Sequence, residues 1–174
     1  MKVFQTLALP AADAGRLTLM LRIPAWVAAP SVSVSLAPAG GGRARSVGTG
    51  APGSYLKLDR SDWVGGDTLS FSLPMRLKAH RYTGLTVIPG HERYAVEFGP
   101  ILLCVVGGAW NRSIDSMLVR GVQAPAAAPE RWLIPTGRPS EIRFRVVGNP
   151  GLAFVPYFLV QEEVFEVYPA FEPV

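Results

Sequence analysis

The sequence contains little cysteine, little histidine and no long apolar run. Cys104 is the only cysteine among 174 residues. It excludes an intrachain disulfide framework and an all-cysteine metal site within the chain. No segment approaches the roughly 20 consecutive apolar residues of a membrane helix, so we expect no membrane partner. The N-terminus has one lysine and only a short apolar run, which is not typical of a signal peptide. We expect a soluble chain and assign no compartment.

Clustered positive charge is also missing. The chain has 17 Lys and Arg against 13 Asp and Glu, a formal net charge of +4. The basic residues are scattered, whereas nucleic-acid-binding proteins usually carry a basic stripe with aromatic residues for base stacking. We therefore expect no nucleic-acid partner.

The dominant feature that is present is a hydrophobic period of two, which is typical of half-buried antiparallel strands. Four segments show it most clearly: RLTLMLRI (16–23), SVSVSL (31–36), DTLSFSL (67–73) and EIRFRVV (141–147). The 16 prolines and 18 glycines fall mostly between such runs. The pattern predicts an all-β fold, an antiparallel β-sandwich or jelly roll, with two small β subdomains.

Two connecting segments suggest how the chain is organised. Residues 37–54 are rich in glycine and predict a long flexible surface loop between two strands. Residues 79–94 separate the earlier strands from the later ones. We therefore expect one β-sandwich over residues 1–80 and a second over residues 81–174.

The stretch LRIPAW (21–26) predicts an abrupt strand end. Pro24 has no N–H for a sheet ladder, and it favours an extended backbone at Ile23. Trp26 is then expected to fold over the end of the sheet and pack there. Stacking of Trp26 on a sugar is the alternative.

Four motifs occur in a recognisable order. They are LTLMLRIPAW (17–26), GSYLKLDRSDWVGGDTLSFSLPMRLKAH (53–80), ERYAVEFGPILLCVVGG (92–108) and LAFVPYFLVQEEVFEVY (152–168). This order resembles the region that follows the catalytic domain in glycoside hydrolase family 127, the β-L-arabinofuranosidase-like proteins. The matching residues include Tyr55, Arg60, Trp63, Gly66 and Asp67.

The resemblance implies accessory β-sandwich domains: residues 1–80 resemble the middle domain of the family and residues 81–174 its C-terminal domain. In the family an (α/α) barrel lying before this region supplies a glutamate acid/base, a cysteine nucleophile and Cys/Glu ligands to zinc. No residue of this chain matches those motifs. The resemblance therefore implies a chain without its own cofactor that is no enzyme by itself. Its implied partner is a catalytic barrel domain or subunit, and a homo-oligomer is a further expectation.

The chain's own candidates for chemistry are few. Cys104 lies in an apolar run without a nearby acid, base or cation, so packing is favoured over catalysis. His80 and His91 lie eleven residues apart, a spacing that fits no tight metal motif, and we expect solvated loop histidines.

Carboxylates are the other candidates for catalysis, because glycoside hydrolysis usually needs two acidic side chains roughly 5 to 10 Å apart. The pairs are Asp59 with Asp62 and Glu162 with Glu163. The single acids are Asp67 and Glu97. None lies in a recognisable pocket motif. We expect no catalytic, cofactor-binding or metal-binding residue.

Binding of an arabinose-containing glycan is the alternative function. Trp110 and Trp132 have loop-like surroundings, so they are the tryptophans expected to be exposed and to contact carbohydrate. The tripeptide NRS (111–113) matches the N-glycosylation acceptor pattern, which matters only in a eukaryotic secretory pathway.

Overall fold

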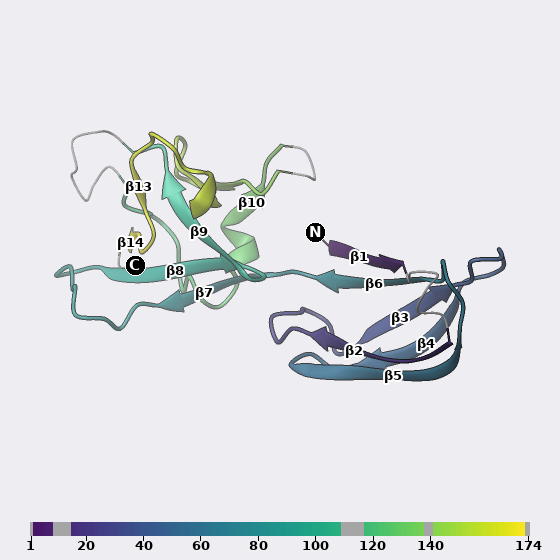
Figure 1. The fold of residues 1–174 in the computed structure, drawn as a ribbon. Helices are drawn as coiled ribbons and strands as arrows, with labels where there is room; N and C mark the ends of the chain where they lie inside the picture. Colours follow the sequence, from purple (N-terminus) through teal and green to yellow (C-terminus); the bar gives the residue numbers. More distant parts are fainter. Residues whose placement is uncertain (1, 9–14, 109–116, 138–140, 173–174) are drawn as a thin grey trace. The chain divides into compact units, whose positions relative to one another are not determined.

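The structure is a computed structural model that describes residues 2–8, 15–108, 117–137 and 141–172 (Figure 1). The chain divides into two compact units, Met1–Arg76 and Leu77–Val174. The described regular structure is almost entirely β, with two short 3-10 turns and no α-helix. The strands of the described residues pair antiparallel, and an isolated bridge between Val119 and Phe171 is parallel. The predicted all-β, sandwich-like class is confirmed.

The first unit contains two antiparallel sheets. Its strands are β1 (Lys2–Ala8), β2 (Gly15–Ile23), β3 (Val32–Ala37), β4 (Arg45–Gly50), β5 (Ser54–Trp63) and β6 (Thr68–Pro74). One sheet has the order β1-β6-β3-β4, and the other pairs β2 with β5. The strand β1, which the sequence did not suggest, lies along β6 with Lys2 opposite Pro74 and Ala8 opposite Thr68 (Figure 1).

The two sheets of this unit bury one apolar core between them. Val34, Leu36 and Leu69 from the larger sheet pack with Leu58 and Trp63 from the smaller one. Alternate side chains of β3 are buried, as the period of two predicted. Such burial is worth about 1.5–3 kcal/mol for each large aliphatic side chain.

The predicted flexible loop at residues 37–54 is partly wrong, because it contains β4. This strand pairs with β3 from Val32 opposite Gly50 to Leu36 opposite Arg45, with a register shift between Val34 and Ser35. A Cβ added at Gly50 would lie 2.9 Å from Ile23 Cγ1. Glycine therefore permits close packing here, and the same glycines gave the sequence a loop-like composition.

The end of β2 is built as the sequence predicted. Val27 N donates to Pro24 O at 3.2 Å, so the chain turns directly after the strand. Trp26 is partly buried and packs against a cluster that contains Ile23, Val32 and Leu73. Packing accounts for this tryptophan.

The second unit is a single curled sheet with added strands. Its elements are β7 (Leu77–Arg81), β8 (Glu92–Phe98), β9 (Ile101–Val106), η3 (Pro129–Arg131), β10 (Leu133–Pro135), β11 (Phe144–Val146), β12 (Ala153–Pro156), η4 (Tyr157–Leu159), β13 (Phe165–Glu166) and β14 (Ala170–Phe171). The order is β10-β11-β12-β9-β8-β14, with β7 on β8 and β13 on β9.

Aromatic rings fill much of the core of this unit. Trp132 makes edge-to-face contacts with Phe154 and Phe171, with ring centroids 5.8 and 5.4 Å apart. Phe98 and Phe144 form a similar pair. Such pairs add about 0.5–1.5 kcal/mol beyond the buried area.

A buried amide braces the same unit. Asn149 is 8% exposed. Its Oδ1 accepts from Arg120 N at 2.9 Å, and its Nδ2 donates to Arg120 O at 2.9 Å and to Val147 O at 3.0 Å. The side chain thus joins the turn after β11 to residues 117–120.

Within the residues that the structure covers, no helix combines the length and the hydropathy that crossing a membrane requires.

Candidate functional site

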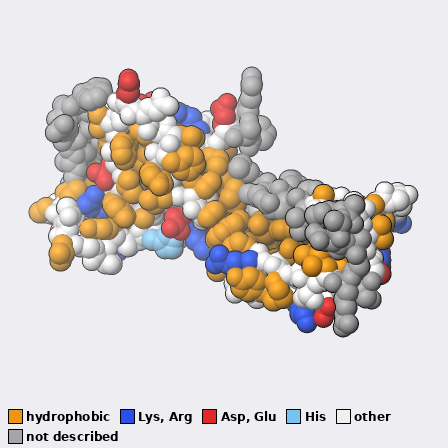
Figure 2. All heavy atoms as spheres, viewed as in Figure 1, with side chains coloured by type: hydrophobic (Ala, Val, Ile, Leu, Met, Phe, Trp, Pro, Cys, Tyr) orange, Lys and Arg blue, Asp and Glu red, His pale blue; other side chains and the backbone are white. Residues whose placement is uncertain are grey.

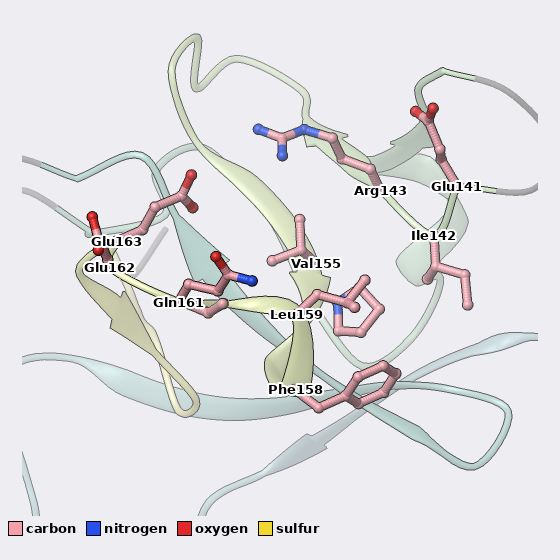
Figure 3. Close-up of a pocket in the computed structure, with 11 residues that line it drawn as sticks. Glu141, Ile142, Arg143, Val155, Phe158, Leu159, Gln161, Glu162 and Glu163 are labelled. Atoms are coloured by element: carbon pink, nitrogen blue, oxygen red, sulfur yellow. The ribbon is translucent and has the colours of Figure 1, made fainter.

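A groove of about 670 Å³ lies beside η4 in the second unit (Figure 3). Pro156 ends β12 with φ −55°, and the next three residues form the single 3-10 turn of η4. This turn exposes Tyr157, Phe158 and Leu159 at 50%, 59% and 61%. A proline-terminated strand therefore places three consecutive apolar side chains on the surface.

Beneath and around this turn the groove has an apolar floor and a charged rim. Val155 and Leu159 lie in its middle, between the two sides (Figure 3). The polar rim residues are Glu141 and Arg143 on one side, and Gln161, Glu162 and Glu163 on the other (Figure 3). Hydrophobic side chains also gather on the face of this unit that Figure 2 shows.

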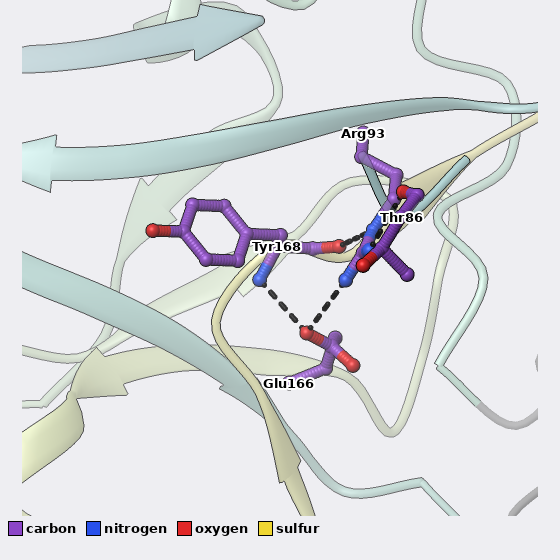
Figure 4. Close-up of polar contacts among 4 residues, drawn as sticks. All are labelled: Thr86, Arg93, Glu166 and Tyr168. Atoms are coloured by element: carbon purple, nitrogen blue, oxygen red, sulfur yellow. Dashed lines mark hydrogen bonds and ion pairs between the residues drawn. The ribbon is translucent and has the colours of Figure 1, made fainter. Parts of the chain in front are cut away.

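A second notable cluster surrounds Arg93, whose side chain is 11% exposed. Its Nε donates to Tyr168 O at 2.8 Å and its Nη1 to Thr86 O at 3.2 Å (Figure 4). Its Nη2 contacts Glu166 Oε1 at 3.1 Å, and the same carboxylate oxygen accepts from Tyr168 N at 3.0 Å.

Two aromatic rings complete this cluster. The guanidinium carbon of Arg93 lies 5.1 Å from the ring centroid of Tyr82 and 5.8 Å from that of Tyr168. The donors of Arg93 are therefore engaged by the chain itself. The arrangement fixes the loop between β7 and β8 and is not poised to bind a ligand.

The thiol of Cys104 is fully buried in β9, and its Sγ donates to Val155 O at 3.7 Å. Burial raises the pKa of Cys104 to about 11. Since the thiolate is the nucleophile and the metal ligand, this environment suppresses both roles.

The two histidines have different neighbours. His80 Nε2 lies 3.4 Å from Glu97 Oε2, across β7 and β8. His91 Nδ1 lies 3.1 Å from Pro89 O. Of the residues that are described, no three His, Cys, Asp or Glu side chains are grouped to hold a metal ion.

The carboxylate candidates of the first unit have separate structural partners. Asp59 accepts from Thr18 Oγ1 at 2.9 Å and lies 3.0 Å from Lys57 Nζ. Hydrogen bonds from Lys57 and Thr18 lower the pKa of Asp59, which opposes a role as general acid. Asp62 lies 3.9 Å from Arg45 on the surface.

Asp67 is buried and structural. It is 3% exposed. Its Oδ1 accepts from Ala39 N and its Oδ2 from Val64 N, both at 3.1 Å. Gly66 before it has φ +90°, so the Gly-Asp pair of the motif forms a tight turn. Trp63 donates from Nε1 to Leu17 O at 2.7 Å.

The expected exposure of Trp132 is wrong. The side chain is 5% exposed, because its ring packs on Phe154 and Phe171 and its Nε1 donates to Pro125 O at 3.1 Å. Its neighbours in sequence resemble a loop, but they fold over the core. Trp110 and the tripeptide at residues 111–113 lie outside the described residues.

Sequence reasoning missed the groove and the Arg93 cluster. The run YFLV (157–160) continues an apolar strand, and only Pro156 signals that the chain turns outward. The partners of Arg93 at residues 166 and 168 lie more than seventy positions away. No local pattern could connect them.

Comparison with known proteins relates the first unit to a family of domains. Residues 4–75 match the family model described as "Beta-L-arabinofuranosidase, GH127 middle domain". The first unit is therefore related to the GH127 family, which confirms the resemblance in the sequence.

A solved structure has the same fold over nearly the whole chain. A protein described as "Glycoside hydrolase" is 17% identical, with a TM-score of 0.54, over 99% of this chain and 30% of its own. A GH127 β-L-arabinofuranosidase from Geobacillus stearothermophilus T6 is 19% identical, with a TM-score of 0.48, over 97% of this chain and 28% of its own. No curated protein matches the chain. The chain thus spans less than a third of either solved protein.

Proposed function

We propose that this chain is a non-catalytic accessory region of a GH127-type glycoside hydrolase, and that it supports a catalytic domain outside these 174 residues. The observation that carries the proposal is the match of residues 4–75 to a domain described as the middle domain of that family. The chain also covers only 30% of a solved glycoside hydrolase that shares its fold.

The chemistry of the described residues supports the same function. The buried acid Asp67 is occupied by two backbone N–H groups, and the only thiol has a raised pKa. Glu162 and Glu163 are exposed beside the groove. A glycosidase acid usually sits in a cleft with its carboxyl group turned toward the substrate, whereas both oxygens of Asp67 accept backbone hydrogen bonds within its turn.

A turnover assay and a stability assay test the proposal together. The purified chain should not hydrolyse 4-nitrophenyl β-L-arabinofuranoside. When it is added to the separately produced catalytic domain from the same genome, that domain should unfold at a higher temperature, because a partner that binds only the folded form stabilises it. Hydrolysis by the chain alone, or an unchanged unfolding temperature, would contradict the proposal.

Weak binding of arabinose-containing glycans is the second candidate. It is favoured by the exposed ring of Phe158, which lines the groove together with the polar side chains of Gln161 and Glu162, because sugars stack on aromatic faces and hydrogen-bond to such groups. Titration of arabino-oligosaccharides by calorimetry should then release heat that disappears in Phe158→Ser.

A further inference from the structure

The groove beside η4 is an unusual surface for a chain that acts alone. Single exposed apolar residues are ordinary on protein surfaces, but contiguous apolar patches mark sites of interaction. Tyr157, Phe158 and Leu159 are consecutive, and each is at least half exposed. Phe158 and Leu159 border a groove with an apolar floor, and the ring of Tyr157 contacts that of Phe158, so the patch is continuous rather than scattered.

The charge of the rim indicates the charge of the partner that would bind in the groove. Glu141, Glu162 and Glu163 contribute three negative charges and Arg143 contributes one positive charge, a local balance of −2. The whole chain carries +4. The groove is therefore acidic on a basic protein, and charge complementarity favours a cationic partner.

We propose that this groove docks a segment of the catalytic domain whose apolar side chains are flanked by Lys or Arg. The inference rests on the proposed function and names the surface that would perform it. The exposed part of η4 supplies the apolar anchors, and the three carboxylates set the register of the basic flanks. The 70% of the solved glycoside hydrolase that this chain does not cover is where the partner lies.

The shape of the groove favours a polypeptide over a sugar. Its floor includes aliphatic side chains such as Val155 and Val160, and its charges stand at the edges. A polypeptide side chain fits such a floor, whereas a sugar needs hydrogen-bonding groups where the floor has none. A stable interface buries about 800 Å² on each partner, so the groove forms the centre of a larger contact.

The test measures the affinity between this chain and the separately produced catalytic domain by calorimetry. Phe158→Ser/Leu159→Ser removes two apolar anchors, and Leu85→Ser/Val87→Ser is the matched control, because those residues are 101% and 74% exposed outside the groove. Glu162→Gln/Glu163→Gln removes two rim charges, and Glu130→Gln/Glu172→Gln removes two exposed charges elsewhere in the unit. Circular dichroism confirms that each variant is folded.

We expect the apolar groove variant to weaken binding by about 30-fold or more, the level of an interface hot spot. The charge variant should weaken it several-fold and reduce its dependence on salt. Both controls should stay within about twofold of the wild type, since neither pair borders the groove.

Each remaining outcome overturns the inference in a recognisable way. Equal binding by all variants would show that the accessory function holds but the interface lies elsewhere. Loss of binding only in the Leu85/Val87 variant would move the interface to the β7–β8 loop. If the wild-type chain binds no catalytic domain, the proposed function fails together with the groove. If arabino-oligosaccharides bind and Phe158→Ser abolishes this, the groove is a sugar site instead.

Discussion

At the scale of single residues, Arg93 is the side chain that connects the most distant parts of the second unit. It hydrogen-bonds Thr86 nearby and reaches Glu166 and Tyr168, which lie 73 and 75 positions further on. Hydrogen bonds to charged groups contribute about 1.5–3 kcal/mol, and more is lost when a buried partner stays unpaired. The cluster therefore holds the β7–β8 loop against the C-terminal strands.

Replacing Arg93 by Gln should lower the free energy of unfolding by about 2–3 kcal/mol, because Gln cannot reach three acceptors at once. Urea unfolding measures the change. Arg81→Gln is the matched control: its side chain is 65% exposed in an ion pair with Glu92, so a change within about 0.5 kcal/mol is expected. Equal effects of the two substitutions would show that the cluster is not stabilising.

Two buried acids predict how stability changes at high pH. Burial raises the pKa of Cys104 from 9.0 to about 11. Burial and a 2.6 Å hydrogen bond to Glu92 raise that of Tyr94 from 10.0 to about 12. The folded chain keeps both protons to higher pH than the unfolded chain. The stability that the two protonated side chains contribute to the folded chain is complete below pH 9. It is lost as the pH rises toward 11 and 12.

The free energy of unfolding should therefore fall between pH 9 and pH 11, and Cys104→Ala should make this fall shallower. Urea titrations at several pH values measure it, and Tyr94→Phe should act the same way between pH 10 and pH 12. A fall of unchanged slope in both variants would mean that other groups control the alkaline range.

At the scale of elements, the turn between β5 and β6 depends on one carboxylate. Asp67 accepts from Val64 within the turn and from Ala39 beyond β3. It thus links the turn to the chain that leaves the neighbouring strand. This gives a physical reason for the Gly-Asp pair that follows Trp63 in the sequence.

Asp67→Asn should destabilise the first unit by about 1.5–3 kcal/mol, because one acceptor oxygen becomes a donor that faces a backbone N–H. Thermal unfolding followed by circular dichroism measures the loss. Asp62→Asn is the control, since that side chain is 65% exposed. Comparable loss in the control would contradict the role of the turn.

The strands differ in how well the sequence predicts them. β3, β6 and the part of β2 whose side chains are described follow the period of two, because one face of each is buried. The sequence did not predict β4, because its glycines suggest a loop. In the folded chain they leave room for the side chains that pack closely against the strand. The sequence did not predict β1, because its partners in β6 lie 60 to 72 positions away. The sequence predicted neither the groove nor the burial of Trp132, because the exposure of a segment depends on what packs over it.

At the scale of the whole molecule, each unit has its own core. The first is built from residues such as Val34, Leu58 and Leu69, and the second from Phe154, Phe171 and Trp132. No residue of the one cluster belongs to the other. Independent cores are the property that lets units fold separately.

The fragments 1–76 and 77–174 should therefore each fold when produced alone. Dispersed amide signals in nuclear magnetic resonance spectra and cooperative thermal unfolding would show this. Fragment 1–60 is the control, because it cuts β5 and removes β6 and should stay unfolded. An unfolded 1–76 fragment would show that the first core needs residues of the second half.

The closing strands of the two units have a consequence for synthesis on the ribosome. β1 finds its partner once residue 74 has left the exit tunnel, so the first unit can be complete while translation continues. In the second unit, β8 can pair with β14 only after Ala170 and Phe171 have been synthesised. During that interval β9, with its apolar run Leu103–Val106, lacks the strands that later cover it. A nascent chain stalled near residue 150 is therefore the form in which this protein is most exposed to chaperones and to aggregation.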